Sequence, residues 1–437
     1  MSVWEKTVAL CFTLIGLLYC YYLYDTNRPM LLEMASSTAV QHNCTSPTCL
    51  SSISRALRTS SCKPHNHVVY IKTHKTGSTT LQQVIQMHGF RHRLSFLFNE
   101  KSPKNGHIRY SFVSNTTQRK FLPPINIAHG DYSNYRNYDI LAAHMKYNRT
   151  VLNWYMKNDS KYISIVREPV AQFESAFDFF KIANKMSKRT HGLGLRSPID
   201  QWLNNPGLYL KGLGGPKGTV WVSLNNGQML DLGLDANDIN NITEVKKTVK
   251  NLSEELDLVL VTEYFDESLV LLKRLLCWSF EDIVYFSQNQ RHRRRRLRES
   301  TKHRIRKWNH ADMLLYKHFN ETLWRKIEEY GPTFHDDLKT FRKTKDKVTR
   351  ECAVKTEMHL DHKGIVRYRT GQTATRCKLL TDSKELFYEI WKRQSPGSHH
   401  VKTSKSDLQH QIATRRHQIA ARGRNIPWPI RARARTG

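Results

Sequence analysis

The stretch VVYIKTHKTGSTTLQQVI, residues 68–85, is the most informative part of this 437-residue chain for predicting its fold. It starts as a β-branched strand, breaks into a loop of lysine, threonine, glycine and serine, and resumes with helical periodicity. A strand that delivers such a loop to a helix N-terminus presents backbone N–H groups to an anion, so we expect a phosphate-binding loop rather than an ordinary strand and turn with incidental lysines. The loop is not a Walker A motif, because Lys75 precedes Gly77 and no upstream glycine completes the pattern. An ATPase or nucleotide kinase is therefore disfavoured.

Alternating strand and helix patterns continue along the chain. The runs HVVYI (67–71), YISIV (162–166) and LDLVLV (256–261) are rich in β-branched residues, and each is followed by a turn and a helix-period segment. A long helix is expected over residues 311–331, with Gly331 and Pro332 as its stop signal. This order predicts an α/β fold with a central, mainly parallel sheet flanked by helices.

The N-terminal region differs in composition from the rest of the chain. Residues 7–24 form an uncharged run of 18 residues, at the short end of what spans a bilayer. A cleaved signal peptide is the alternative, but no small-residue cleavage site follows, and the tyrosines of the run resemble an interfacial belt. We expect five segments: a cytoplasmic tail (1–6), a transmembrane signal-anchor (7–24), a stem (25–66), a catalytic domain (67–393) and a basic, disordered tail (394–437).

Cysteines and glycosylation sequons indicate the compartment. Six of the eight cysteines lie outside the predicted span, without metal-binding spacing, and so predict disulfides in an oxidising lumen, with 15 connectivities left open. Seven N-x-[ST] sequons favour the same side of the membrane. The candidate glycosylation sites are Asn43, Asn115, Asn148, Asn158, Asn241, Asn251 and Asn320.

The formal net charge of +31 predicts attraction to polyanions, but it does not choose among nucleic acid, a membrane surface, an acidic glycan and a nucleotide. The run RHRRRRLR (291–298) would suit a nucleic-acid patch or a localisation signal by composition alone. A location in the lumen favours a different role for this run: a solvated loop, or a loop that contacts anionic lipid or glycan.

Two motifs together resemble a known enzyme family. YIKTHKTGSTTL (70–81) resembles the 5′-phosphosulfate loop of membrane-anchored carbohydrate sulfotransferases that use 3′-phosphoadenosine 5′-phosphosulfate (PAPS), and YISIVREPVAQFESAFDFF (162–180) resembles their 3′-phosphate segment. Glu168 departs from the usual Arg-Asp-Pro triplet of that segment. Three more stretches, at 139–148, 258–286 and 315–331, narrow the resemblance to the galactose 3-O-sulfotransferases, which include galactosylceramide sulfotransferases.

This resemblance implies a P-loop-like sulfotransferase fold and transfer of a sulfuryl group from PAPS to the 3-hydroxyl of a galactose on a glycolipid or glycoprotein glycan. It also implies a single-pass type II protein of the Golgi membrane with a lumenal catalytic domain. Neither a metal nor a nucleic-acid partner is expected, and homo-oligomerisation is left open. The alternatives are a uronyl or hexosamine O-sulfotransferase and, in another class, a catalytically inactive, membrane-anchored glycan-binding protein.

The resemblance also assigns nucleotide-binding roles. Lys75 would neutralise the bridging oxygen of the leaving phosphate, and the backbone N–H groups of residues 76–79 with the Ser78 and Thr79 hydroxyls would hold the 5′-phosphate. Arg167 and Ser175 would hold the 3′-phosphate. The full expected set is Lys72, Thr73, His74, Lys75, Thr76, Gly77, Ser78, Thr79, Arg167 and Ser175.

A sugar hydroxyl needs a general base, and histidine suits that role near neutral pH. His144 is favoured, because it follows an apolar run in AAHMKYN and matches the family's histidine after its second strand. His74, inside the loop, is the alternative, and a purely structural histidine remains a third interpretation. Glu263, at the end of the third predicted strand, is expected either to orient the acceptor or to form a structural ion pair.

Overall fold

A computed structural model describes residues 62–98, 121–125, 135–187, 197–210, 223–288, 290–291, 296–357 and 365–395. These residues belong almost entirely to one compact unit, Pro64–Gly437. The predicted cytoplasmic tail, membrane anchor, most of the stem and nearly all of the basic C-terminal tail lie outside the described residues. Within the described part, none of the helices is long and apolar enough to cross a membrane.

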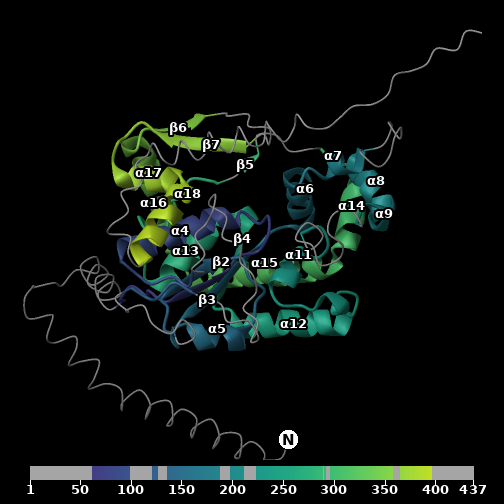
Figure 1. Ribbon diagram of the computed structural model, residues 1–437, viewed down its shortest axis with the longest axis horizontal. Coiled ribbons are helices and arrows are strands. Elements are labelled where there is room, and N and C mark those ends of the chain that lie inside the picture. Colours follow the sequence, from purple (N-terminus) through teal and green to yellow (C-terminus); the bar gives the residue numbers. More distant parts are fainter. Residues whose placement is uncertain are drawn as a thin grey trace, which may run out of the picture. The chain divides into compact units, whose positions relative to one another are not determined.

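The centre of the unit is a parallel, four-stranded sheet (Figure 1). Its strands are β1 (Val68–Ile71), β2 (Ile140–Ala143), β3 (Lys161–Val166) and β4 (Leu258–Val261), in the order β2-β1-β3-β4. All three neighbouring pairs are parallel. The strands are almost wholly buried, as expected for a parallel sheet covered by helices on its faces. The predicted α/β class and the three predicted strands are confirmed, and β2 lies in the stretch 139–148.

The strand order creates a topological switch point at the carboxyl ends of β1 and β3, the position termed the crevice. From β1 the chain passes through α4 (Ser78–Arg91) to β2, and then through α5 (Arg149–Tyr155) to β3 on the other side of β1. The connections that leave β1 and β3 therefore run in opposite directions. In open α/β sheets, ligands bind outside the carboxyl ends of the strands at such a switch point. The lysine-rich loop follows β1 there, and Arg167 follows β3.

Further helices flank the sheet. After β4, a 3₁₀ turn η2 (Thr262–Tyr264) leads into α13 (Phe265–Leu276), whose buried leucines pack in the core. The predicted long helix is α15 (His310–Tyr330), and Gly331 ends it with a positive φ of 85°. The other helices that surround this core are α12 (Ile242–Glu255), α16 (Phe334–Glu351), α17 (Thr375–Thr381) and α18 (Ser383–Gln394).

A second apolar cluster lies among shorter helices, which Figure 1 groups away from the sheet. Phe173, Phe177 and Trp202 are fully buried in it. The helices are α6 (Pro169–Phe179), α7 (Ile182–Ser187), α8 (Pro198–Asn204), α9 (Pro206–Leu210) and α14 (Glu299–Trp308). Because α6 starts immediately after the end of β3, this cluster is directly connected to the crevice.

A small antiparallel sheet, not predicted from the sequence, has the order β5-β7-β6. Its strands are β5 (Gln290–Arg291), β7 (Ile365–Thr370) and β6 (Val354–Glu357). A disulfide joins Cys352, just before β6, to Cys377 in α17. This bond fits the oxidising compartment that the cysteines and sequons predict.

Candidate active site

The loop after β1 has the backbone of an anion-binding nest. Lys75 and Gly77 both adopt left-handed conformations, with φ of 64° and 72°, and Thr76 lies between them. Such alternation turns successive N–H groups toward one point. Gly77 is the N-cap of α4 and provides no side-chain cap, so the first-turn N–H groups and the positive end of the helix dipole are available to an anion. The loop therefore has the backbone conformation of an anion-binding nest, and phosphate binding stays a prediction.

Side-chain hydrogen bonds tie this loop to the neighbouring strands. The Thr73 hydroxyl donates to the Ile165 carbonyl of β3 at 2.6 Å. Thr262, at the end of β4, donates to the Thr76 carbonyl at 2.6 Å. The Ser78 hydroxyl donates to the Thr73 carbonyl at 2.6 Å and is buried, whereas Thr79 is half-exposed. Ser78 therefore stabilises the loop from within, and Thr79 is the more accessible hydroxyl.

The two motifs meet at the crevice. The guanidinium Nη1 of Arg167 donates to the Lys75 carbonyl at 3.1 Å, although the two residues are 92 positions apart. The ammonium group of Lys75 lies 3.6 Å from the centre of the Phe179 ring, at the end of α6. Ser175 is buried two turns into the same helix. The loop after β1 and the Arg-Glu-Pro turn after β3 thus form one site.

The departure at Glu168 has a clear local role. Its carboxylate accepts a hydrogen bond from the Ala171 N–H at 2.9 Å and so caps α6, and Pro169 occupies the first helical position. The second carboxylate oxygen pairs with Arg306 at 3.2 Å. A glutamate therefore performs the capping function that an aspartate of the Arg-Asp-Pro triplet would perform.

His74 is held by a carboxylate that the sequence analysis did not identify. Asp231 Oδ2 accepts a hydrogen bond from the His74 backbone N–H at 2.7 Å and also lies 2.8 Å from its Nδ1. Asp231 is the last residue of the short helix α11 (Gly227–Asp231) and is only 9% exposed in its side chain. If Nδ1 carries the proton toward this carboxylate, Nε2 of His74 is a free base.

The two candidate bases stack on each other. The rings of His74 and His144 have centroids 4.1 Å apart and an angle of 16° between their planes. His144 directly follows β2, and its Nδ1 is 2.8 Å from the Lys72 carbonyl. Burial, followed by the positive charge of Lys72, holds the pKa of His144 well below its usual value. His144 is therefore neutral near pH 7.

Lys72 is buried beneath the loop. Its ammonium group donates to Gln82 Oε1 at 2.7 Å. Burial, together with the charge of Lys75, lowers the pKa of Lys72 to about 7. A bound polyanion would favour the charged form of this lysine and oppose that shift.

Helix α11 supports both motifs. The Gln228 side chain accepts from the Arg167 N–H at 2.7 Å and donates to its carbonyl at 2.9 Å. Asp312 of α15 accepts from the N–H groups of Gln228 and Met229 at the start of α11. Asp312 is fully buried, and burial raises its pKa to about 7. A chain of contacts from α15 through α11 thus positions both His74 and Arg167.

Glu263 lies in η2, just after β4, beside the Arg-Glu-Pro turn. Its Oε1 accepts from the Glu168 N–H at 3.2 Å and is 4.0 Å from Arg167 Nε. Burial raises the pKa of Glu263. The sequence left two roles open for Glu263, orienting the acceptor or forming a structural ion pair. Its position beside Arg167 and Glu168 is compatible with either role.

The structure brings the predicted residues from 72 to 79 together with His144 and Arg167. Ser175 is buried in α6, the helix that contacts this loop through Gln172 and Phe179. The sequence missed Asp231, Gln228, Asp312 and Thr262, which no local pattern distinguishes from ordinary polar residues. Of the sequons, Asn148, Asn158, Asn241 and Asn251 are exposed and Asn320 is half-buried, whereas Asn43 and Asn115 lie outside the described residues.

Comparison with known proteins identifies the family. A family model described as Galactose-3-O-sulfotransferase matches residues 3–373. The chain is 32% identical to human galactosylceramide sulfotransferase over 275 residues, which make up 62% of this chain and 60% of the relative. It is 30% identical to mouse galactose-3-O-sulfotransferase 3 over 295 residues, covering 66% of this chain and 63% of the relative.

The match thus spans about three fifths of the length of these curated relatives. The family model, in contrast, covers most of this chain and includes both the loop after β1 and the Arg-Glu-Pro turn after β3. The chain therefore belongs to the galactose-3-O-sulfotransferase family.

Proposed function

We propose that this protein transfers a sulfuryl group from PAPS to the 3-hydroxyl of a galactose residue on a glycolipid or glycan. The observation that carries the proposal is the contact between Arg167 and the Lys75 carbonyl at 3.1 Å. This contact places the anion-binding loop after β1 next to the arginine after β3. PAPS carries phosphate groups at its 3′ and 5′ positions, so its binding site needs two such elements close together. The names of the relatives, which include galactosylceramide sulfotransferase, supply the acceptor class.

The proposed binding roles follow from the donor chemistry of each element. The nest at Lys75–Gly77 and the uncapped start of α4 hold the 5′-phosphate, with Thr79 as the accessible hydroxyl. Arg167 and Ser175 hold the 3′-phosphate. Lys75 moves from the ring of Phe179 to the bridging oxygen, where negative charge develops as the sulfuryl group leaves.

For proton removal we propose His74 with Asp231 as the working pair. A carboxylate at Nδ1 orients the ring and stabilises the imidazolium that forms when Nε2 accepts the proton of the galactose hydroxyl. The sequence favours His144 as the base, but burial lowers its pKa, and among the described residues its Nδ1 contacts a backbone carbonyl and not a carboxylate. In this proposal the neutral His144 ring stacks on His74 and fixes its plane.

The remaining segments complete the proposal. Residues 7–24 anchor the chain in the Golgi membrane as a single-pass type II protein, residues 25–66 form a stem, and residues 67–393 form the lumenal catalytic domain. The exposed sequons Asn148, Asn158, Asn241 and Asn251 are the better placed glycosylation sites among the described residues. Residues 394–437 are a basic tail.

The test is sulfation of defined acceptors by the purified full-length chain with labelled PAPS. We expect transfer to galactosylceramide and to a lactosyl acceptor, and no transfer to the matched 3-deoxygalactosyl compound. The Lys75→Ala variant is the control for enzyme-dependent transfer. Transfer only to uronic-acid or hexosamine acceptors would replace the proposal with its first alternative. Stabilisation by 3′,5′-ADP and binding of galactosides without any transfer would favour an inactive glycan-binding protein.

A further inference from the structure

A cluster of metal-ligating side chains lies at the opposite end of α4 from the nucleotide loop. His88 and His92 are four residues apart near the C-terminus of the helix, and Asp282 approaches them from the segment after α13. The ligand atoms of the three side chains lie within 4.8 Å of one another. His88 is ten residues after Ser78, about 15 Å along a helix that rises 1.5 Å per residue. The cluster is therefore separate from the candidate active site.

His88 has an unusual electrostatic environment. Its ring is 1% exposed, and its Nε2 lies 2.9 Å from Asn66 Oδ1. Nε2 therefore donates to this oxygen, which leaves Nδ1 as the lone-pair nitrogen of the imidazole ring. Nδ1 is buried and has no hydrogen-bond partner among the described residues. Nδ1 lies 3.7 Å from Asp282 Oδ1. The nitrogen and the carboxylate oxygen therefore face each other, and each offers a lone pair.

We propose that His88, His92 and Asp282 bind a divalent transition-metal ion of the Zn²⁺ class. Two histidine nitrogens and one carboxylate oxygen form a ligand set that Zn²⁺ accepts, with water as a fourth ligand. Bond lengths of about 2.0–2.2 Å place tetrahedral ligands about 3.4 Å apart. The 3.7 Å between His88 Nδ1 and Asp282 Oδ1 therefore needs a slight closure, and the wider separations in the cluster, within 4.8 Å, need a larger one. A cation between the two groups also removes their mutual repulsion.

The surroundings of the cluster support a cation. Asn66 fixes the His88 tautomer that leaves Nδ1 as a ligand, as the outer hydrogen bonds of metal-bound histidines do. Histidines at i and i+4 lie on one face of a helix, and the C-terminal end of a helix carries partial negative charge. Ser279 donates two hydrogen bonds to Asp282 Oδ2 and leaves Oδ1 to face His88.

Arg91 is the competing cation at this carboxylate. Its Nη1 lies 2.9 Å from Asp282 Oδ1, but its side chain is 27% exposed and can rotate toward solvent. The guanidinium does not reach a bond with His88 Nδ1, which stays unpartnered when Arg91 is in place. Arg91 alone therefore satisfies the carboxylate and leaves the buried imidazole nitrogen unsatisfied.

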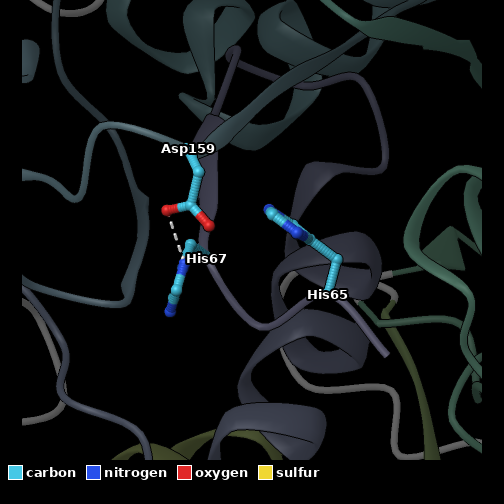
Figure 2. A group of neighbouring side chains, drawn as sticks. All are labelled: His65, His67 and Asp159. Carbon is cyan, nitrogen blue, oxygen red and sulfur yellow. Dashed lines mark hydrogen bonds and ion pairs between the residues drawn. The ribbon is translucent and has the colours of Figure 1, made fainter. Parts of the chain in front are cut away.

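A second group of similar composition provides an internal control. Figure 2 shows His67 directed at Asp159, with His65 beside them. His67 Nδ1 lies 2.7 Å from Asp159, and its Nε2 lies 3.2 Å from the Lys157 ammonium group. Both ring nitrogens of His67 are thus engaged, and a positive charge already occupies one side of the ring. We assign no metal to this group.

The bound ion would connect three segments: the chain before β1 through Asn66, the end of α4, and the segment after α13. Trp278 stacks on His88 with ring centroids 3.8 Å apart, which places a fluorophore beside the ion. The role is structural, so removing the ion would lower stability and leave the chemistry of the nucleotide loop in place.

The experiment titrates the chelator-treated full-length chain with ZnCl₂ and follows its thermal unfolding. We expect the wild type to be stabilised, and His92→Ala, whose side chain is exposed, to fold normally and lose at least tenfold in zinc affinity. The isosteric Asp282→Asn variant should also have a lower affinity for zinc, whereas His67→Ala should bind zinc with the affinity of the wild type. Cu²⁺ should quench Trp fluorescence in the wild type and less in Trp278→Phe.

Three outcomes overturn the proposal: no stabilisation of the wild type, full zinc affinity in His92→Ala, or loss of zinc affinity in His67→Ala. The second and third results would assign the zinc effect to other histidines. The sulfation assay is not needed for any of these readouts, so the outcome is independent of the proposed function.

Discussion

Asp231 holds His74 at two points, because Oδ2 accepts the backbone N–H at 2.7 Å and also lies 2.8 Å from the ring Nδ1. The two residues are 157 positions apart, and the carboxylate comes from a helix that also positions Arg167 through Gln228. One short element thus orients a base in the first motif and an arginine in the second.

Replacing Asp231 with Asn should lower turnover on the order of 10²-fold, since the amide no longer stabilises an imidazolium at His74. The affinity for 3′,5′-ADP should stay near that of the wild type. Steady-state kinetics and nucleotide binding measure the two effects, with Asp235→Asn, an exposed carboxylate nearby, as the control. An equal loss of nucleotide affinity and turnover would show that Asp231 only supports the loop.

Replacing His74 with Ala should abolish most turnover, by on the order of 10²–10⁴, because a general base is lost. His144→Ala should cost less, because its role is to fix the plane of the His74 ring. Single-turnover rates with saturating PAPS compare the two. The reverse ranking would make His144 the base, and a His74→Ala enzyme with a tenth of the wild-type rate would exclude His74 from that role.

Replacing Lys75 with Ala should reduce turnover by on the order of 10² or more, because the charge that stabilises the leaving phosphate is removed. Galactoside affinity should change little. The matched control is Lys185→Ala, an exposed lysine of α7. Unchanged turnover in Lys75→Ala would show that Lys75 does not stabilise the charge on the bridging oxygen.

Replacing Arg167 with Ala should lower the affinity for 3′,5′-ADP by roughly tenfold to a hundredfold, the usual effect of losing a hydrogen bond to a charged group. Affinity for 5′-AMP, which lacks the 3′-phosphate, should change far less. Isothermal titration with both nucleotides separates the two cases, and Ser175→Ala should show the same pattern more weakly. An equal loss for both ligands would indicate a general defect of the loop.

Asp312 should make the stability of the protein depend on pH. Its pKa in the folded state is raised to about 7 by burial, above the value of about 3.9 in an unfolded chain, so ionisation opposes folding. Its contribution to the free energy of unfolding is therefore highest below about pH 4 and declines until about pH 7.

Urea unfolding of the wild type and Asp312→Asn across this range measures the effect. As the pH rises, the free energy of unfolding of the wild type should fall by on the order of a few kcal/mol relative to that of the variant. Asp346→Asn, at an exposed position of α16, should follow the wild type. Parallel pH profiles for wild type and Asp312→Asn would contradict the raised pKa.

The α/β class, three of the four central strands, the loop after β1 and the Arg-Glu-Pro turn after β3 could all be predicted from the amino-acid sequence. These features are local: buried strands need β-branched runs, and a left-handed turn at a helix start needs a residue such as Gly77. The resemblance of these two motifs, and of three further stretches, to the galactose 3-O-sulfotransferases also pointed to the family that the comparison with known proteins shows.

Which groups from distant segments meet could not be predicted, because their contacts form only in the folded chain. Asp231, Gln228 and Asp312 lie in stretches without motif character, and they acquire their roles because α11 packs between α15 and the crevice. The pairing of His88 with Asp282 across 194 positions arises in the same way. Strand and turn preferences act over a few residues, whereas the pKa and the partners of a side chain depend on burial and charges that only the folded chain brings together.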